Sequence, residues 1–211
     1  MLGSPAYTES FSEELAIPGP RVPITKSAEL FRRGAELGRA LIQLHTYGER
    51  FGPDGKKVPV PRGRAEYARA IPDTPEGYPE DYAYDPDEEV LRVGDGEIQG
   101  VDERVWNYEV SGLRVVRSWL GYRMKEAAGR SSSPLDEIRP ERWTGEMTVE
   151  LLELLWVLEA TVEREPELAA FLEEVTAGPI FEAEELPLLS EDEKKPPKKA
   201  SEPVQDELGL S

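Results

Sequence analysis

The 211-residue sequence contains no cysteine and a single histidine, His45. Disulfide bonds and thiolate metal sites are therefore excluded, and a cluster of imidazole ligands cannot form. His45 falls near the end of a predicted helix, where a hydrogen-bonded structural histidine is expected rather than a catalytic one. From these absences we expect neither a metal site nor a bound cofactor.

Long apolar runs are also missing. No run approaches the ~20 residues that a membrane-spanning helix needs, and the N-terminus lacks the basic and apolar regions of a secretion signal. The sequence gives no support for a membrane partner or for secretion. We therefore expect a cytoplasmic protein.

Motifs for catalysis are missing as well. An adenine methyltransferase needs a glycine-rich loop for S-adenosylmethionine and an Asn-Pro-Pro-Tyr-like turn for the flipped base, and neither occurs. Gly94, Gly96 and Gly100 have the wrong spacing for a dinucleotide-binding loop, and there is no Walker A loop. The acids at 85–89 resemble the start of a calcium loop without its later ligands, which favours a solvated turn. The sequence thus predicts no catalytic residues.

The net charge of -18 is unevenly distributed. Residues 51–70 and 111–145 each carry a charge of +3, whereas residues 71–110 carry -11 and residues 146–211 carry -13. DNA-binding proteins normally show a basic footprint. The total charge therefore argues against a DNA partner, but the two basic segments could together form one DNA-binding face. The acidic segments could instead face neighbouring domains of a longer protein.

The composition divides the chain into three parts. Residues 1–25 are rich in proline, glycine and serine, and predict an extended lead-in. Residues 26–188 contain the amphipathic segments and predict one compact domain. Residues 189–211 are charged and nearly free of apolar side chains, so we expect a disordered acidic tail.

The first helix is expected from Ser27, a good N-cap, to about Tyr47, with Gly48 ending it. Its leucines share one face: Leu30, Leu37, Leu41 and Leu44. Gly34 and Gly38 would let another backbone approach closely. A tightly packed structural helix is the expectation.

Strands are expected at 57–60 and 67–71, followed by a hairpin over 85–105 that turns at Gly94-Asp95-Gly96. Residues 106–110 would add another strand, and Gly112 would end it. The fold class is therefore α+β, a small antiparallel sheet with a packed helical layer.

Two further helices are expected toward the C-terminus. Thr148 should cap the first, which has an inward leucine face and outward glutamates. Pro166 should open the second, which Gly178 ends. We expect these two helices to form an antiparallel pair that caps the sheet, with Trp156 in the core.

Residues 113–128 have the period of a helix with two distinct faces. An apolar arc contains Leu113, Val116, Trp119, Leu120 and Met124, and a narrow stripe contains Arg114, Arg117, Gly121 and Lys125. A glycine flanked by cations suits the approach of a nucleic-acid strand, although an ordinary solvated face has the same composition. Arg123 falls inside the apolar arc, so it needs a carboxylate or carbonyl partner and is expected to be structural.

The segment 129–145 combines arginines, serines and Trp143. Arginine suits bidentate contacts to guanine, and small hydroxyls bind phosphates or base edges. Capping arginines and serine-rich turns are also common structural devices, and Asp136 and Glu137 could simply neutralise Arg139 and Arg142. The composition permits DNA readout without requiring it.

The stretch from Trp106 to Glu163 contains all four tryptophans and is the most distinctive part of the sequence. Four segments resemble the C-terminal specificity domain of type ISP restriction-modification enzymes. The two most specific are YEVSGLRVVRSWLGYR and SSPLDEIRPERWT, and the two weaker ones are VPITKSAELFRRGAELGRALIQLHTYG and ELLELLWVLEATVE. The resemblance covers roughly residues 18–187. It implies that this domain reads the target sequence in double-stranded DNA, while an adenine methyltransferase and a nuclease-helicase, absent from this chain, carry out the chemistry.

Two functional classes remain open. The first is a noncatalytic DNA-recognition domain, either the C-terminal fragment of such an enzyme or a separate specificity subunit. The second is an acidic protein-interaction module or DNA mimic. Clustering of the basic residues would favour the first, and acids interspersed among them the second. The predicted DNA-binding residues are Arg62, Arg64, Arg114, Arg117, Ser118, Lys125, Arg130, Ser132, Arg139 and Arg142.

Overall fold

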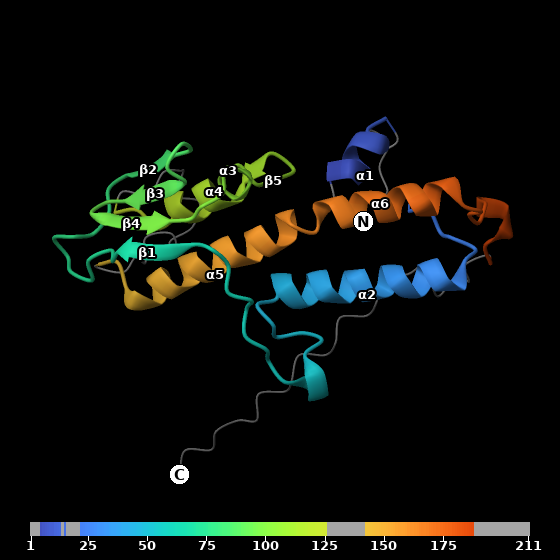
Figure 1. Cartoon of the computed structure of the whole chain (residues 1–211), viewed down its shortest axis with the longest axis horizontal. Helices are drawn as coiled ribbons and strands as arrows, with labels where there is room; N and C mark the ends of the chain where they lie inside the picture. The colour runs from blue at the N-terminus through green and yellow to red at the C-terminus, as the bar shows by residue number, and fades with distance from the viewer. Residues whose placement is uncertain (1–4, 14, 16–21, 126–141, 188–211) are drawn as a thin grey trace, which may run out of the picture.

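A computed structural model describes residues 5–13, 15, 22–125 and 142–187. A small antiparallel sheet lies at one end of a long helical body (Figure 1). This arrangement confirms the predicted α+β class. The predicted tail over 189–211 and most of the segment 129–145 lie outside the described residues.

The sheet has four strands in the order β1-β4-β3-β2, all antiparallel to their neighbours. They are β1 (Glu66–Arg69), β2 (Tyr82–Asp85), β3 (Val90–Val93) and β4 (Gly96–Gln99). The predicted hairpin at Gly94 is confirmed, and Gly94 has a positive φ of 52°. The strand predicted over 57–60 is wrong. Two prolines in and beside that segment lack the N–H groups that a sheet needs.

The core lies between the sheet and the helices. Leu91 and Ile98, cross-strand partners in β3 and β4, are fully buried together with Val116 and Leu120 of α4 (Val115–Gly121). Trp143 is also fully buried, and its indole Nε1 donates to Thr148 Oγ1 at 2.9 Å. The aromatic side chain just before the last helices is therefore part of the core.

The structure between the sheet and α4 differs from the prediction. Glu103–Trp106 forms the helix α3, capped by Asp102, whose carboxylate accepts from the Arg104 backbone N–H at 2.7 Å. The strand predicted over 106–110 is reduced to β5 (Glu109–Val110), which pairs with β6 (Leu113–Arg114). Ser111 and Gly112, with φ of 51° and 85°, make the tight turn between them. Because 113–114 are used in this pair, the next helix starts later than predicted.

The helix α4 also ends earlier than its apolar period suggests. It stops at Gly121. The backbone N–H of Lys125 donates to the carbonyl of Pro79 at 2.8 Å, so it is not available to continue the helix. A tertiary hydrogen bond thus overrides the local pattern.

The helix α5 runs over Gly145–Val162 and buries an inward leucine face, as predicted. Its N-cap is Thr144, whose hydroxyl accepts from the Met147 N–H at 3.2 Å. The prediction of Thr148 as the cap is wrong, because its hydroxyl binds Trp143 instead. Trp156 packs against the core and donates to the Ala65 carbonyl at 2.8 Å.

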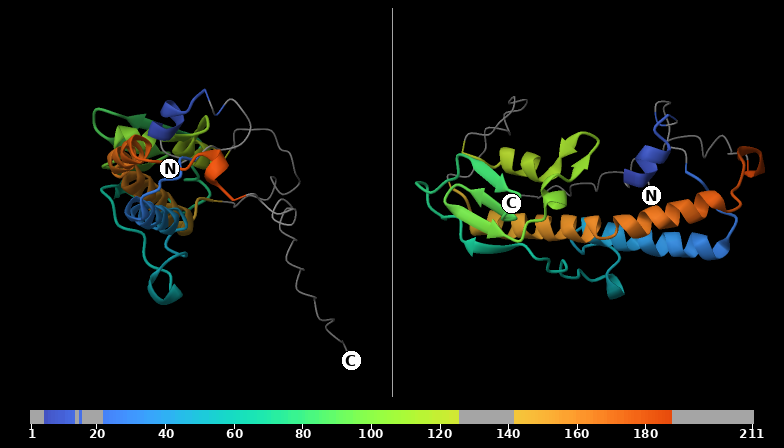
Figure 2. Two further views of the ribbon diagram at one scale, coloured as in Figure 1. Left: turned by 90° about the vertical axis from the view of Figure 1, so that its right-hand side faces the viewer. Right: turned by 45° about the horizontal axis from the view of Figure 1, so that its top comes forward.

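The antiparallel pairing of the last two helices is wrong. Helix α6 (Glu165–Ala177) continues beyond α5 nearly end to end, and α2 (Ala28–His45) lies alongside both (Figures 1 and 2). The chain does not reverse, since Glu163 and Arg164 keep helical backbone conformations and helix-type hydrogen bonds. Ser27 caps α2 as predicted, and His45 Nε2 lies 3.0 Å from Thr161 Oγ1.

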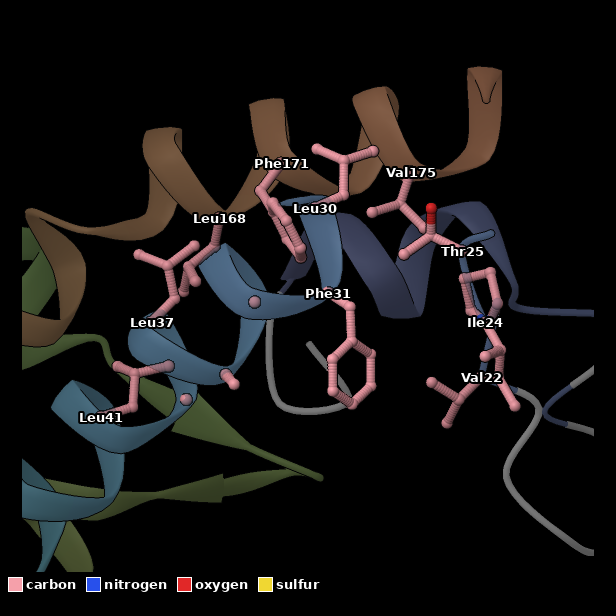
Figure 3. A pocket seen from close by; sticks show the side chains of 14 residues that line it. Val22, Ile24, Thr25, Leu30, Phe31, Leu37, Leu41, Leu168, Phe171 and Val175 are labelled. Carbon is pink, nitrogen blue, oxygen red and sulfur yellow. The ribbon is translucent and has the colours of Figure 1, made fainter. Parts of the chain in front are cut away.

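Helices α2 and α6 approach each other closely at Gly34. A Cβ on Gly34 would lie 2.8 Å from the Phe171 ring, so the close neighbour is a side chain, not the backbone that the sequence predicts. Gly38 has no such neighbour within 4 Å. Figure 3 shows the apolar groove of about 310 Å³ between these helices and residues 22–25.

The N-terminal region is not wholly extended. Pro5–Ser10 forms the short helix α1, which packs against α6 and buries Tyr7. In the described part of the chain, no helix has the length and apolar character needed to cross a membrane.

Candidate nucleic-acid interface

Seven of the ten predicted DNA-binding residues are described by the structure. Arg130, Ser132 and Arg139 lie outside the described residues, as do Asp136 and Glu137. The seven described residues fall into three groups, on α4, at the edges of the undescribed segment, and before β1.

The first group lies on and before α4. Arg114 belongs to β6 and its side chain is 56% exposed, with Nε 3.7 Å from a carboxylate oxygen of Glu109, its cross-strand partner. Arg117 lies over the Trp106 ring at 4.8 Å and donates to Asn107 Oδ1 at 3.0 Å. Ser118 is partly exposed on the same helix. The predicted helical stripe is therefore wrong in its geometry, because two of its four members lie outside the helix.

The second group flanks residues 126–141. Lys125 Nζ lies 2.6 Å from Glu80 Oε1, and Arg142 Nε lies 2.7 Å from Asp73 Oδ1. The hydrogen bond from Lys125 lowers the pKa of the Glu80 carboxyl below its usual range. Both acids belong to the loop that leads into β2, so one loop contacts both residues that flank 126–141.

The third group precedes β1, and its two arginines differ sharply. The Arg62 side chain is 74% exposed, and its contact with the Glu66 carboxylate is long, at 3.9 Å. Arg64 instead contacts three carboxylates, those of Glu89, Glu159 and Asp102. Its contact with Glu159 is the shortest, at 2.8 Å, and Glu159 also accepts from the Arg64 backbone N–H at 2.8 Å. This geometry gives Arg64 a structural role in joining the segment before β1 to α5.

Acidic side chains are thus interspersed among the predicted DNA-binding cations. Of the six described ones, only Arg117 shows no carboxylate within 4.0 Å among the described ion pairs. This is the arrangement expected of the interaction-module alternative. A DNA phosphate would have to displace an acid at each of the other five positions.

Arg123 has the structural partners that its position in the apolar arc predicts. Its guanidinium stacks on the Trp119 ring at 3.9 Å and donates to Glu150 Oε2 at 3.2 Å. Glu150 belongs to α5, so Arg123 joins the segment just after α4 to another helix. Trp119 in turn packs edge-on against Trp143, with ring centroids 6.0 Å apart.

A polar cleft of about 530 Å³, which the sequence analysis does not predict, lies beside Trp119 and Arg123. The turn after α2 forms one wall, and Trp119, Arg123 and two glutamates of α5 form the other. Tyr47 enters the cleft with a positive φ of 50°, an uncommon backbone conformation for an aromatic residue. Burial, and then the charges of Glu153 and Glu150, raise the pKa of Tyr47. In the sequence, the Tyr-Gly pair at 47–48 is the local signal of the backbone bend that follows α2.

The described residues contain no group of three or more His, Asp or Glu side chains placed to hold a metal ion. Many of their charged side chains form ion pairs.

Comparison with known proteins gives one family. The sequence model of the type ISP C-terminal specificity domain matches residues 1–154, which include the whole sheet, α4 and the first half of α5. No curated protein matches the chain, and no solved structure matches it.

Proposed function

The chain belongs to the type ISP C-terminal specificity domain family, and from this premise we propose that it is a noncatalytic domain that recognises a sequence in double-stranded DNA. The family match is the observation that carries the proposal. We propose that the chain works together with an adenine methyltransferase and a nuclease-helicase, as the C-terminal part of one enzyme or as a separate specificity subunit. Its place would be the cytoplasm, in restriction of foreign DNA such as that of phages.

We propose that the DNA-facing surface is centred on α4 and the segment that follows it. Arg114, Arg117 and Ser118 would contact the DNA backbone, because phosphate contacts set the orientation of a protein on the duplex. Lys125 and Arg142 would add contacts beside base-reading side chains from Arg130, Ser132 and Arg139. Arg62, the most exposed of the described candidates, would extend this surface toward β1.

The acids paired with these cations affect the affinity and the salt dependence expected for DNA binding. Surface ion pairs with both partners half exposed are weak, typically ~0–1 kcal/mol, so a phosphate held in good geometry can replace the carboxylate. Each exchanged cation would still release a DNA counterion and contribute about 0.9 to the salt slope. We therefore expect modest affinity with a clear salt dependence, despite the net charge of -18.

The interspersed acids also support a second candidate function. A protein-interaction module or DNA mimic would use the acidic surface itself to bind a basic partner. The two functions differ in a direct prediction. Only the first requires that replacing basic residues on α4 removes affinity for DNA.

The test is fluorescence anisotropy of the whole chain with a labelled random-sequence duplex over a salt series. In the variant R114E/R117E, we expect DNA affinity to be lost and any remaining salt slope to be shallower by about 2. The matched control is R33E/R39E on α2, which makes the same charge change. Arg33 and Arg39 also lie over aromatic rings, those of Phe171 and Phe51.

Both variants are first checked by thermal melting, because Arg117 packs on Trp106. Loss of binding in R114E/R117E, with the control unchanged, supports the proposed surface. Equal binding in the two variants contradicts the assignment of Arg114 and Arg117. Absence of binding in the wild-type chain at low salt favours the interaction module.

A further inference from the structure

One acidic loop contacts both residues that flank the segment 126–141. The loop over residues 72–81 carries Asp73, 2.7 Å from Arg142, and Glu80, 2.6 Å from Lys125. The Lys125 backbone N–H also donates to the Pro79 carbonyl at 2.8 Å. Two acids seven residues apart therefore engage two cations seventeen residues apart.

The loop is anchored, so the two acids have fixed positions. Ile71 and Tyr78 are buried in the core and Pro79 is almost fully buried. Within the loop, the Gly77 N–H donates to Thr74 Oγ1 at 3.2 Å, and a Cβ on Gly77 would lie 2.4 Å from Pro72. Asp73 and Glu80 therefore lie on a loop whose backbone is held in place by the core.

The two ion pairs are short but open to solvent. The side chains of Asp73 and Arg142 are 50% and 55% exposed, and those of Glu80 and Lys125 are 67% and 48% exposed. An incoming phosphate can therefore reach each cation from the solvent side. It must compete with a carboxylate that is already in hydrogen-bonding position, and the competition is lost unless the phosphate is well aligned.

Non-specific and specific DNA respond differently to such competition. Non-specific binding rests almost entirely on charge, whereas specific binding adds base contacts that fix the register of the phosphates. Acids that neutralise cations at the interface therefore weaken binding to random DNA more than binding to the recognised sequence. The protein thereby binds all DNA less tightly but discriminates better between the recognised sequence and random DNA.

We propose that Asp73 and Glu80 are specificity-determining residues, which hold Arg142 and Lys125 in ion pairs that only the phosphates of a correctly registered duplex replace. This inference rests on the proposed DNA-binding function and deepens it. The two acids would not contact DNA themselves. Their role would be to position Arg142 and Lys125 and to compete with DNA phosphates for these two cations.

The test compares D73N/E80Q with wild type by fluorescence anisotropy on a 30-base-pair random-sequence duplex at several salt concentrations. We expect the variant to bind this duplex about tenfold more tightly near 0.1 M salt and with a steeper salt slope, because two carboxylates no longer compete with phosphates for Arg142 and Lys125. The charge-conserving variant D73E/E80D should restore wild-type behaviour. A purely structural role for the loop would not steepen the salt slope.

The matched control is E174Q/E185Q, which removes two acids that make ion pairs of the same length elsewhere. Glu174 and Glu185 lie 2.7 Å from Arg33 and Lys26, and their side chains are 50% and 43% exposed. We expect this control to bind random DNA within twofold of wild type, the effect of net charge alone. Thermal melting of all the variants checks that the fold is intact, and the single variants D73N and E80Q are used if the double one melts early.

The outcomes separate the two proposals. Equal affinities and slopes for D73N/E80Q and E174Q/E185Q, with wild type binding DNA, would overturn the inference and leave the proposed function standing. Weaker binding by D73N/E80Q would overturn it as well, since the acids would then support the interface. No DNA binding by wild type or by any variant would contradict the proposed function.

Discussion

Replacement of Arg64 by alanine should destabilise the fold and leave DNA affinity nearly unchanged. Sequence reasoning placed Arg64 among the DNA-binding residues, but its guanidinium contacts Glu89, Glu159 and Asp102. The Glu159 side chain is only 11% exposed. Removing its partner therefore leaves a carboxylate with poor solvation.

The size of the effect follows from the burial of the two partners. Breaking a fully buried pair costs about 3–5 kcal/mol. Here Arg64 is 51% exposed, and Glu159 keeps its hydrogen bond from the Arg64 backbone N–H, so a smaller loss is expected. We expect a loss of about 2 kcal/mol, which corresponds to a lower Tm by about 4–8 °C for a chain of this size.

The assay is urea unfolding followed by tryptophan fluorescence, paired with anisotropy on random-sequence duplex DNA. R62A is the control, because Arg62 is 74% exposed and its carboxylate contact is 3.9 Å long. R62A should keep its stability within about 0.5 kcal/mol and lose DNA affinity, the reverse of R64A. A stability of R64A equal to that of wild type, together with lost DNA binding, would refute this reasoning.

Two further predictions concern the fold around the site. G48A should lose about 2 kcal/mol or more in urea unfolding, because Gly48 has a φ of 75° and a Cβ there would lie 1.8 Å from the Val58 carbonyl oxygen. G55A, with a φ of 68° and open space, should lose less, and equal losses would contradict the steric explanation. The hydrogen bond from Arg104 lowers the pKa of Asp102, so the stabilisation should be complete above the unfolded pKa of about 3.9 and lost as the pH falls through the lower folded pKa. Urea midpoints of wild type and D102N should therefore differ at pH 7 and converge as the pH falls through the folded pKa of Asp102, and a constant difference would speak against this linkage.

Local sequence signals predicted much of the fold. The Ser27 cap, the turn at Gly94 and the leucine face of α5 are all set by neighbouring residues, and each is present in the structure. The errors arise where distant segments decide the outcome. Helix α4 stops early because Pro79, more than forty residues away, accepts the Lys125 N–H. Helix α2 packs against both α5 and α6, which lie end to end, and no local pattern predicts these long-range contacts.

The candidate site shows the same division. Residue types alone identified the cations, and helical periodicity correctly marked Arg123 as an arginine that needs a partner. Periodicity could not show that Glu159 binds Arg64 from 95 residues away, or that one loop holds Lys125 and Arg142. Ion pairing is non-local, so the free or paired state of a basic residue is visible only in the folded chain.

The most direct measurement of the central claim is a selection of bound fragments from a random duplex pool by the purified chain, followed by sequencing. We predict that one sequence motif is enriched, and that binding to it weakens steeply as salt is raised. Retention of fragments without any enriched motif, or no retention even at low salt, would contradict the assignment of this chain as a domain that recognises a DNA sequence on its own.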